Sequence, residues 1–340
     1  MSLILPGRSN SDGVAQRRAF LKAAAAGIAV TGLCGGRVGA VAGQGSPSRP
    51  AETPETLTAQ LYKSLTAEQK SLMSFEFDNP LRNEVDNNWH ITKAVIGQHF
   101  DKDQQALIRD IFLGLHSEEY AEKVMQQVEH DNRNTNRTDG FSGCSVAMFG
   151  TPGSGKFEFV LTGRHVTRRV DGDSLEGTAF GGPIFYGHAA GDFNEAPDHP
   201  GNVYWYQAKR ANELFQALDG KQRQTALRMD AREEQQKATV ALRMPGQFAG
   251  LPVSDMTTDQ KSLAVEVMKD VLAPFRKADV DESMRVIEAA GFDQLHFSYY
   301  SNLDVGNDRI WDVWQVEGPN TVWYFRGDPH VHTWVHLRKN

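Results

Sequence analysis

The sequence has little that could cross-link the fold or anchor it in a membrane. Two of its 340 residues are cysteines, Cys34 and Cys144. Cys34 falls within a predicted signal segment, so the mature chain keeps only Cys144 and no intramolecular disulfide is possible. The only apolar run near the N-terminus, Ala23–Leu33, is about half as long as a membrane-spanning helix requires. Stability must therefore come from an ordinary hydrophobic core, and no stable membrane anchor is expected.

Excess positive charge is also missing. The formal net charge is −7 with histidine neutral. Removing residues 1–42, which hold five basic residues and one acid, makes the net charge −11. An acidic surface argues against nucleic acid or an anionic membrane as the partner. A small-molecule or extracellular substrate fits this composition better.

The N-terminus predicts export. Gln16–Lys22 (QRRAFLK) is a twin-arginine motif, followed by the weakly apolar run and by small residues around Val38–Ala42 that suit cleavage. We therefore predict a twin-arginine signal peptide over residues 1–42, recognised by the twin-arginine export machinery, and a periplasmic or secreted protein. Residues 43–54 are predicted to be a disordered linker, and residues 55–340 a single domain.

Four helix starts share one design. Each has Thr or Asp followed three residues later by Gln, with a hydrophobic residue just before: Thr66/Gln69, Asp101/Gln104, Asp219/Gln222 and Thr257/Gln260. They predict an N-terminal helical part over 55–131 and a helical insert over 205–290. The helices expected are 55–72, 101–113, 117–131, 206–217, 219–228, 257–273 and 279–290. Repeated starts suit a duplicated unit, but the residues that follow diverge, which argues against a true repeat.

After a polar break at 131–143 the hydrophobic period changes to two, which predicts strands at 145–149, 157–168 and 178–188 and a C-terminal hairpin turning at Gly318–Asn320. Gly150–Lys156 resembles a phosphate-binding loop, but Phe157 replaces the required hydroxyl and a strand follows, so a turn is predicted. The expected fold is α+β: an antiparallel sheet from 144–188 and 297–337 surrounded by helices. The polar stretch 191–201 is expected to cover a pocket.

Histidines gather on these strands. His330, His332 and His336 have even spacing, so they share one face of a strand, and His165 is placed in the interior by strand parity. Adjacent buried imidazoles without a partner are costly. We therefore predict a metal site with His165, His330 and His332 as ligands and His188 near them. Three neutral imidazoles suit Zn²⁺, Cu²⁺ or Fe²⁺ and leave one position open. His336 is expected at the surface, as are His116 and His130.

Other residues suggest roles in catalysis. Glu317 and Asp312 are the carboxylates nearest the His-x-His pair in sequence, and either is a candidate to orient a ligand or to transfer protons. Arg164 or Arg168 is a candidate to position an anionic group. No G-x-S-x-G motif occurs, and Cys144 has no visible activating neighbour.

Two classes of function follow from these residues. The first is a metal-dependent enzyme, with redox chemistry slightly preferred over hydrolysis because folded export often accompanies redox cofactors. The second is a non-catalytic periplasmic binding or metal-handling protein. Glycines beside the histidines favour the enzyme, since a pocket needs close backbone approach. Exposed His or Met tracts, typical of metal-handling proteins, are missing from the sequence.

Four motifs resemble those of a bacterial family known as domain of unknown function 3500: Gly163–Arg168 (GRHVTR), Ala179–His188 (AFGGPIFYGH), Trp311–Pro319 (WDVWQVEGP) and Phe325–His332 (FRGDPHVH). The resemblance runs from about residue 60 to residue 338. Many members of the family are exported and carry Gly-His-His or Gly-Arg-His in the middle and His-x-His near the end; this chain has Arg164 where many have the first histidine. The resemblance thus supports the histidine site and implies no activity.

Overall fold

The computed structural model describes residues 52–133, 140–188, 202–231, 233–302, 309–327 and 329–339. The predicted signal peptide, most of the predicted linker and the stretch 191–201 lie outside these ranges. The described residues belong to one compact unit. None of the helices in these ranges is long and apolar enough to cross a membrane.

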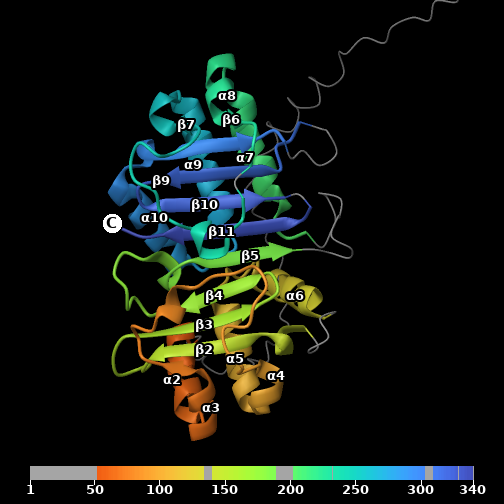
Figure 1. Ribbon diagram of the computed structural model, residues 1–340, viewed down its shortest axis with the longest axis vertical. Helices are drawn as coiled ribbons and strands as arrows, with labels where there is room; N and C mark the ends of the chain where they lie inside the picture. The colour runs from red at the N-terminus through yellow and green to blue at the C-terminus, as the bar shows by residue number, and fades with distance from the viewer. Residues whose placement is uncertain are drawn as a thin grey trace, which may run out of the picture. The chain divides into compact units, whose positions relative to one another are not determined.

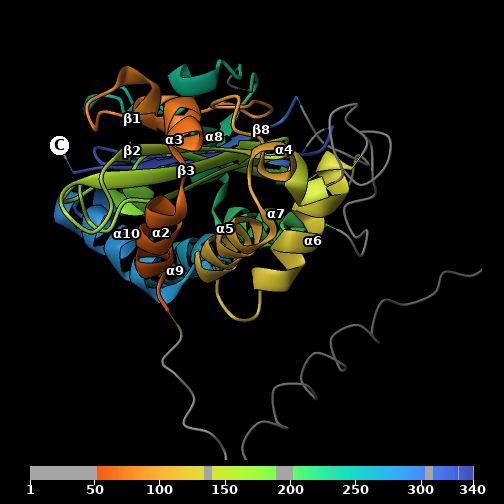
Figure 2. The same ribbon diagram turned by 90° about the horizontal axis from the view of Figure 1, so that it is seen from below.

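An eleven-stranded, mostly antiparallel sheet forms the centre of this unit (Figure 1). The main helices cover one face, and the loops that follow β1 (Ser74–Phe75) and β6 (Leu227–Arg228) cover the other (Figure 2). The predicted α+β fold, an antiparallel sheet with helices around it, is confirmed.

The two halves of the chain repeat nearly the same order of elements. The first half contains α2 (Pro54–Ser64), α3 (Ala67–Met73), β1 (Ser74–Phe75), α4 (Ile96–His99), α5 (Lys102–Gly114), α6 (Ala121–Asn132), β2 (Ser145–Gly150), β3 (Phe157–Gly163), β4 (Val166–Val170) and β5 (Ile184–His188). The second half contains α7 (Trp205–Ala217), α8 (Gly220–Ala226), β6 (Leu227–Arg228), β7 (Leu251–Pro252), α9 (Thr258–Leu272), α10 (Lys277–Ala290), β8 (His296–Tyr300), β9 (Val313–Gly318), β10 (Thr321–Arg326) and β11 (Val331–Leu337). Among these elements, α4 in the first half and β7 in the second have no counterpart.

The strand order shows that the repeat extends to the topology. The order is β1-β2-β3-β4-β5-β11-β10-β9-β8-β6, so the halves meet at the antiparallel pair β5/β11. From this pair to either edge, the strands of the two halves follow in the corresponding order. Each half begins with a short parallel edge pair, β1/β2 or β6/β8, and continues antiparallel. The expectation against a repeat is thus wrong: the topology is repeated, with an approximate two-fold axis through β5/β11.

All four predicted capping boxes are present. Within each half, the two capping glutamines also bond each other through their side-chain amides. Gln69 pairs with Gln104, and Gln222 pairs with Gln260, with N···O distances between 2.7 and 3.1 Å. The single helix predicted over 55–72 is wrong: the cap at Thr66 starts a new helix, so α2 and α3 are separate.

Both faces of the sheet are buried. The larger core lies on the helical side and includes Trp314, Trp323 and Val335. A smaller core on the loop side packs Phe185, Tyr324 and Trp334 under residues of the covering loops. Because side chains alternate along a strand, neighbouring residues of β5 and β11 contribute to opposite cores.

Candidate metal centre

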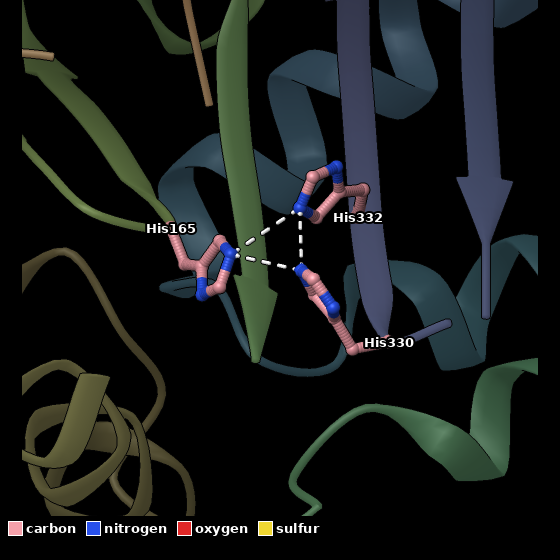
Figure 3. Close-up of side chains that lie close together, drawn as sticks. All are labelled: His165, His330 and His332. Carbon is pink, nitrogen blue, oxygen red and sulfur yellow. Dashed lines mark hydrogen bonds between the residues drawn. The ribbon is translucent and has the colours of Figure 1, made fainter. Parts of the chain in front are cut away.

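Three buried imidazoles meet where β5 ends and β11 begins (Figure 3). The Nε2 atom of His330 lies 3.2 Å from that of His165 and 2.9 Å from that of His332, and the third side of the triangle is 3.2 Å. The three side chains are between 4% and 8% exposed. Among the described residues, they form the one group of three or more His, Cys, Asp or Glu arranged to hold a metal ion.

His165 reaches this point from a tight hairpin. The strand predicted over 157–168 is wrong, because the chain turns at Arg164-His165 and Gly163 pairs with Val166. His165 has a φ of +58°, an uncommon value for a residue with a side chain. Its backbone is held on both sides: its N–H donates to Asn87 O at 2.8 Å, and its carbonyl accepts from Gly187 N at 3.2 Å. The His165 ring is buried, as predicted, but the turn and not the alternation of side chains along a strand places it there.

His330 and His332 reach the meeting point of the three rings from the start of β11. His332 lies opposite Gly187 on β5, and His330 precedes the strand. A side chain at Gly187 would collide with Val331 O, 2.3 Å from an added Cβ, and press on the His332 ring. Glycine is therefore required at position 187 for β5 to pass beside the histidine pair.

Asp131, at the end of α6, orients His165. Its Oδ2 lies 2.7 Å from His165 Nδ1 and also accepts from Gln127 Nε2 at 2.9 Å. Its Oδ1 lies 3.4 Å from His188 Nδ1. Burial opposes ionisation of this carboxyl, but the hydrogen bonds from the two histidines outweigh it and hold the pKa of Asp131 well below its usual value. Asp131 is thus a carboxylate, which can only accept, and His165 carries its proton on Nδ1.

Glu234 orients His332 in the same way. Its Oε2 lies 2.8 Å from His332 Nδ1, and its Oε1 lies 3.0 Å from Arg326 Nε. Burial raises the pKa of Glu234, while the charge of Arg326 opposes that rise. The ion pair with Arg326 favours the ionised form, so His332 also carries its proton on Nδ1.

With both Nδ1 atoms protonated, the Nε2 atoms of His165 and His332 present lone pairs toward each other. Burial lowers the pKa of all three imidazoles, to about 3 for His330, so the cluster is neutral at neutral pH. Two lone pairs 3.2 Å apart repel unless a cation lies between them. Two nitrogens bound to one tetrahedral ion at about 2.0–2.1 Å would stand roughly 3.3 Å apart. The observed spacing fits a shared ion.

His188 does not join the three rings. It is buried on the helical side of the sheet, opposite Val331 rather than His332, and contacts Asp131 instead. Arg164, beside His165, is half-buried and close enough that its charge helps to lower the pKa of each of the three histidines. Of the two predicted arginines, Arg164 is therefore the one at the site.

The other three predicted residues lie away from the rings. Glu317 is level with His336, four residues along from His332 or about 13 Å at strand spacing, and lies 3.3 Å from Arg243. Asp312 precedes β9, two strands from β11, and its carbonyl accepts from Gly327 N. Arg168 is buried on the helical side, where it donates to Phe185 O at 2.7 Å. Their positions give none of the three a contact with the cluster.

The prediction of a surface position is wrong for His116 and only partly right for His336. His116 is 5% exposed, with Nδ1 2.8 Å from Phe112 O and Nε2 accepting from Arg168. His336 is half-buried against the loop side. His130 is exposed, as predicted.

The two orienting carboxylates were not predicted. Asp131 had a usable signal: it continues the apolar face of α6 after Val124 and Val128, where a charged residue needs a buried partner. Glu234 lies in a stretch without regular periodicity, and no sequence signal marks it.

Comparison with known proteins assigns the chain to a family. No curated protein and no solved structure matches it. A family model described as "Protein of unknown function (DUF3500)" matches residues 48–340, which include the whole histidine cluster and both carboxylates. The chain belongs to the DUF3500 family.

Proposed function

We propose that this protein is an exported metal-dependent enzyme whose ion is bound by His165, His330 and His332. The observation that carries the proposal is the fixed tautomer of two rings. Asp131 and Glu234 each accept a hydrogen bond from Nδ1–H of one histidine, so two Nε2 lone pairs are aimed at one buried point beside a third Nε2. Carboxylates that bond the outer nitrogen of ligand histidines are the usual supports of metal sites.

Three protein nitrogens favour catalysis over a purely structural role. Structural zinc sites are normally closed by four protein ligands, whereas catalytic sites keep a position for water or substrate. A bound Zn²⁺, Cu²⁺ or Fe²⁺ would supply Lewis acidity or electron transfer at that position. Among the protein's own groups, Arg164 supplies positive charge suited to an anionic part of the substrate. We favour redox chemistry over hydrolysis because the twin-arginine route carries folded proteins, and cofactors can be inserted before export.

The burial of the cluster argues against a metal-handling role. A protein that passes metal to partners needs ligands that a partner can reach, yet all three rings are at most 8% exposed. The periplasmic or secreted location is proposed from the twin-arginine motif at Arg17-Arg18 and its following apolar run.

An open coordination position can be tested without knowing the substrate. The wild-type protein is loaded with Co²⁺, and its visible spectrum is recorded as azide is added. An enzyme-like site should show a saturable spectral change, absent from His332→Ala. A Co²⁺ spectrum that azide leaves unchanged means that a fourth protein ligand closes the site, which would reject the enzyme and favour the binding protein.

A further inference from the structure

A cavity lies at the opposite end of the β5/β11 pair from the metal centre. It measures about 430 Å³ and lies where β5 begins and β11 ends. Its walls come from the turn before β5, the end of β11 and both covering loops, and include Thr178, Pro183, Lys237, Val240, His336 and Arg338.

The approximate two-fold axis makes this cavity the counterpart of the metal centre. The β9/β10 hairpin pairs Gly318 with Thr321 as the β3/β4 hairpin pairs Gly163 with Val166, so Asn320 occupies the place of His165. The carbonyl of Asn320 accepts from Arg338 N at 3.0 Å, just as that of His165 accepts from Gly187 N. The counterpart position thus keeps the framework of the site but has no histidine in the hairpin.

Its charge differs from that of the molecule as a whole. Lys237 and Arg338 are the charged residues in its walls, and no Asp or Glu lines it, although the chain carries a net charge of −7. Lys237 is paired with Glu84 at 2.5 Å. Arg338 is exposed and makes no ion pair within the described ranges. One guanidinium at the cavity is therefore available to a carboxylate, which it can bind through two parallel hydrogen bonds.

His336 adds a hydrogen-bond acceptor. Its Nδ1 lies 3.0 Å from Val240 O, and a carbonyl can only accept, so the ring proton is on Nδ1. Burial lowers the pKa of this imidazole to about 4, and the nearby charges of Arg338 and Arg169 contribute. The ring is therefore neutral at neutral pH, and its Nε2 can accept from a ligand hydroxyl.

The remaining walls are largely apolar, with Pro183 and Val240 among them and the Thr178 side chain as a further polar group. A cavity of this size with apolar walls and a few polar groups is typical of small-molecule sites. We propose that it binds a small organic carboxylate with an apolar body and a hydroxyl group, the carboxylate on Arg338 and the hydroxyl on His336. This site is separate from the metal centre and does not depend on the function proposed above.

The test uses 4-hydroxybenzoate as the probe and isothermal titration calorimetry of the full-length protein. We expect saturable binding below about 10 mM. Arg338→Gln should weaken it at least about tenfold, since the ligand would lose a bidentate charged contact. Lys339→Gln, the same change of charge one residue along and outside the cavity walls, should change it less than about twofold.

Several results would overturn the proposal. Equal weakening in Arg338→Gln and Lys339→Gln would mean unspecific attraction to charge. Loss of binding in His332→Ala, with Arg338→Gln unaffected, would place the probe at the metal centre. Equal binding of 4-methylphenol, which lacks the carboxylate, or stronger binding of inorganic phosphate would reject the ligand class, and no saturable binding at all would reject the site.

Discussion

Replacing Asp131 by Asn tests whether the outer carboxylates prepare the metal centre. The two side chains have nearly the same shape, so packing at this 2% exposed position should change little. The carboxylate accepts from His165 Nδ1 at 2.7 Å and from Gln127 Nε2 at 2.9 Å. Both contacts use the same oxygen, so the amide oxygen of Asn can still accept them, but without a negative charge; the NH₂ group of Asn would then replace Oδ1, which lies 3.4 Å from His188 Nδ1.

The expected loss of metal affinity follows from the role of the contact between Asp131 and His165. Without the negative charge, the hydrogen bond that favours the Nδ1–H tautomer of His165 is weaker, and a ring protonated on Nε2 cannot bind the ion. Mutations of such orienting groups typically weaken metal affinity about 10- to 100-fold, or roughly 1.4–2.7 kcal/mol. We expect this range for Asp131→Asn and, through His332, for Glu234→Gln.

The assay is competition for Zn²⁺ against a chromophoric chelator, with thermal unfolding followed by circular dichroism to check that each variant folds. Asp110→Asn, an exposed position on α5, is the matched control and should keep the wild-type affinity. If His332→Ala abolishes binding while Asp131→Asn and Glu234→Gln stay within twofold of wild type, the carboxylates do not set the tautomers and the reasoning is wrong.

Two further predictions concern stability. Burial raises the pKa of Asp171 to about 6, so the folded chain holds this proton more tightly than the unfolded chain and stability falls as pH rises from about 4 to above 6. Asp171→Asn should raise the free energy of unfolding by about 1–3 kcal/mol at pH 7.5 and by less than about 1 kcal/mol at pH 4; urea unfolding showing an equal gain at both pH values would contradict this. Gln104→Ala and Gln260→Ala should each lower the free energy of unfolding by about 1–3 kcal/mol, because each removes a helix cap and the side-chain hydrogen bonds of a buried amide. The exposed Gln126→Ala should cost under about 0.5 kcal/mol, and similar losses in all three variants would show that the paired glutamines are ordinary surface residues.

Local features were predictable from the sequence. The capping boxes depend on residues three apart, and the shared face of His330 and His332 depends on strand parity, so short-range chemistry decides both. The strands β1 and β6 were missed because two residues cannot show a period.

The turn that carries His165 could not be predicted in the same way, although His165 itself was predicted as a ligand. Hairpin turns are usually recognised in a sequence by Gly, Asn or Asp at the positions of positive φ. Here His165 takes that conformation, so the sequence suggested a continuous strand. Its backbone bonds to Asn87 and Gly187 stabilise a conformation that the local sequence does not favour. Asp131 and Glu234 reach the cluster through tertiary packing, which spacing along the chain does not encode.

The most direct test of the account is the metal content of the protein purified after export from its own host. Elemental analysis should find close to one equivalent of Zn, Cu or Fe per wild-type chain and less than about a tenth of that in a folded His330→Ala variant. A wild-type protein without bound transition metal, or a variant that keeps its full equivalent, would contradict the three-histidine centre.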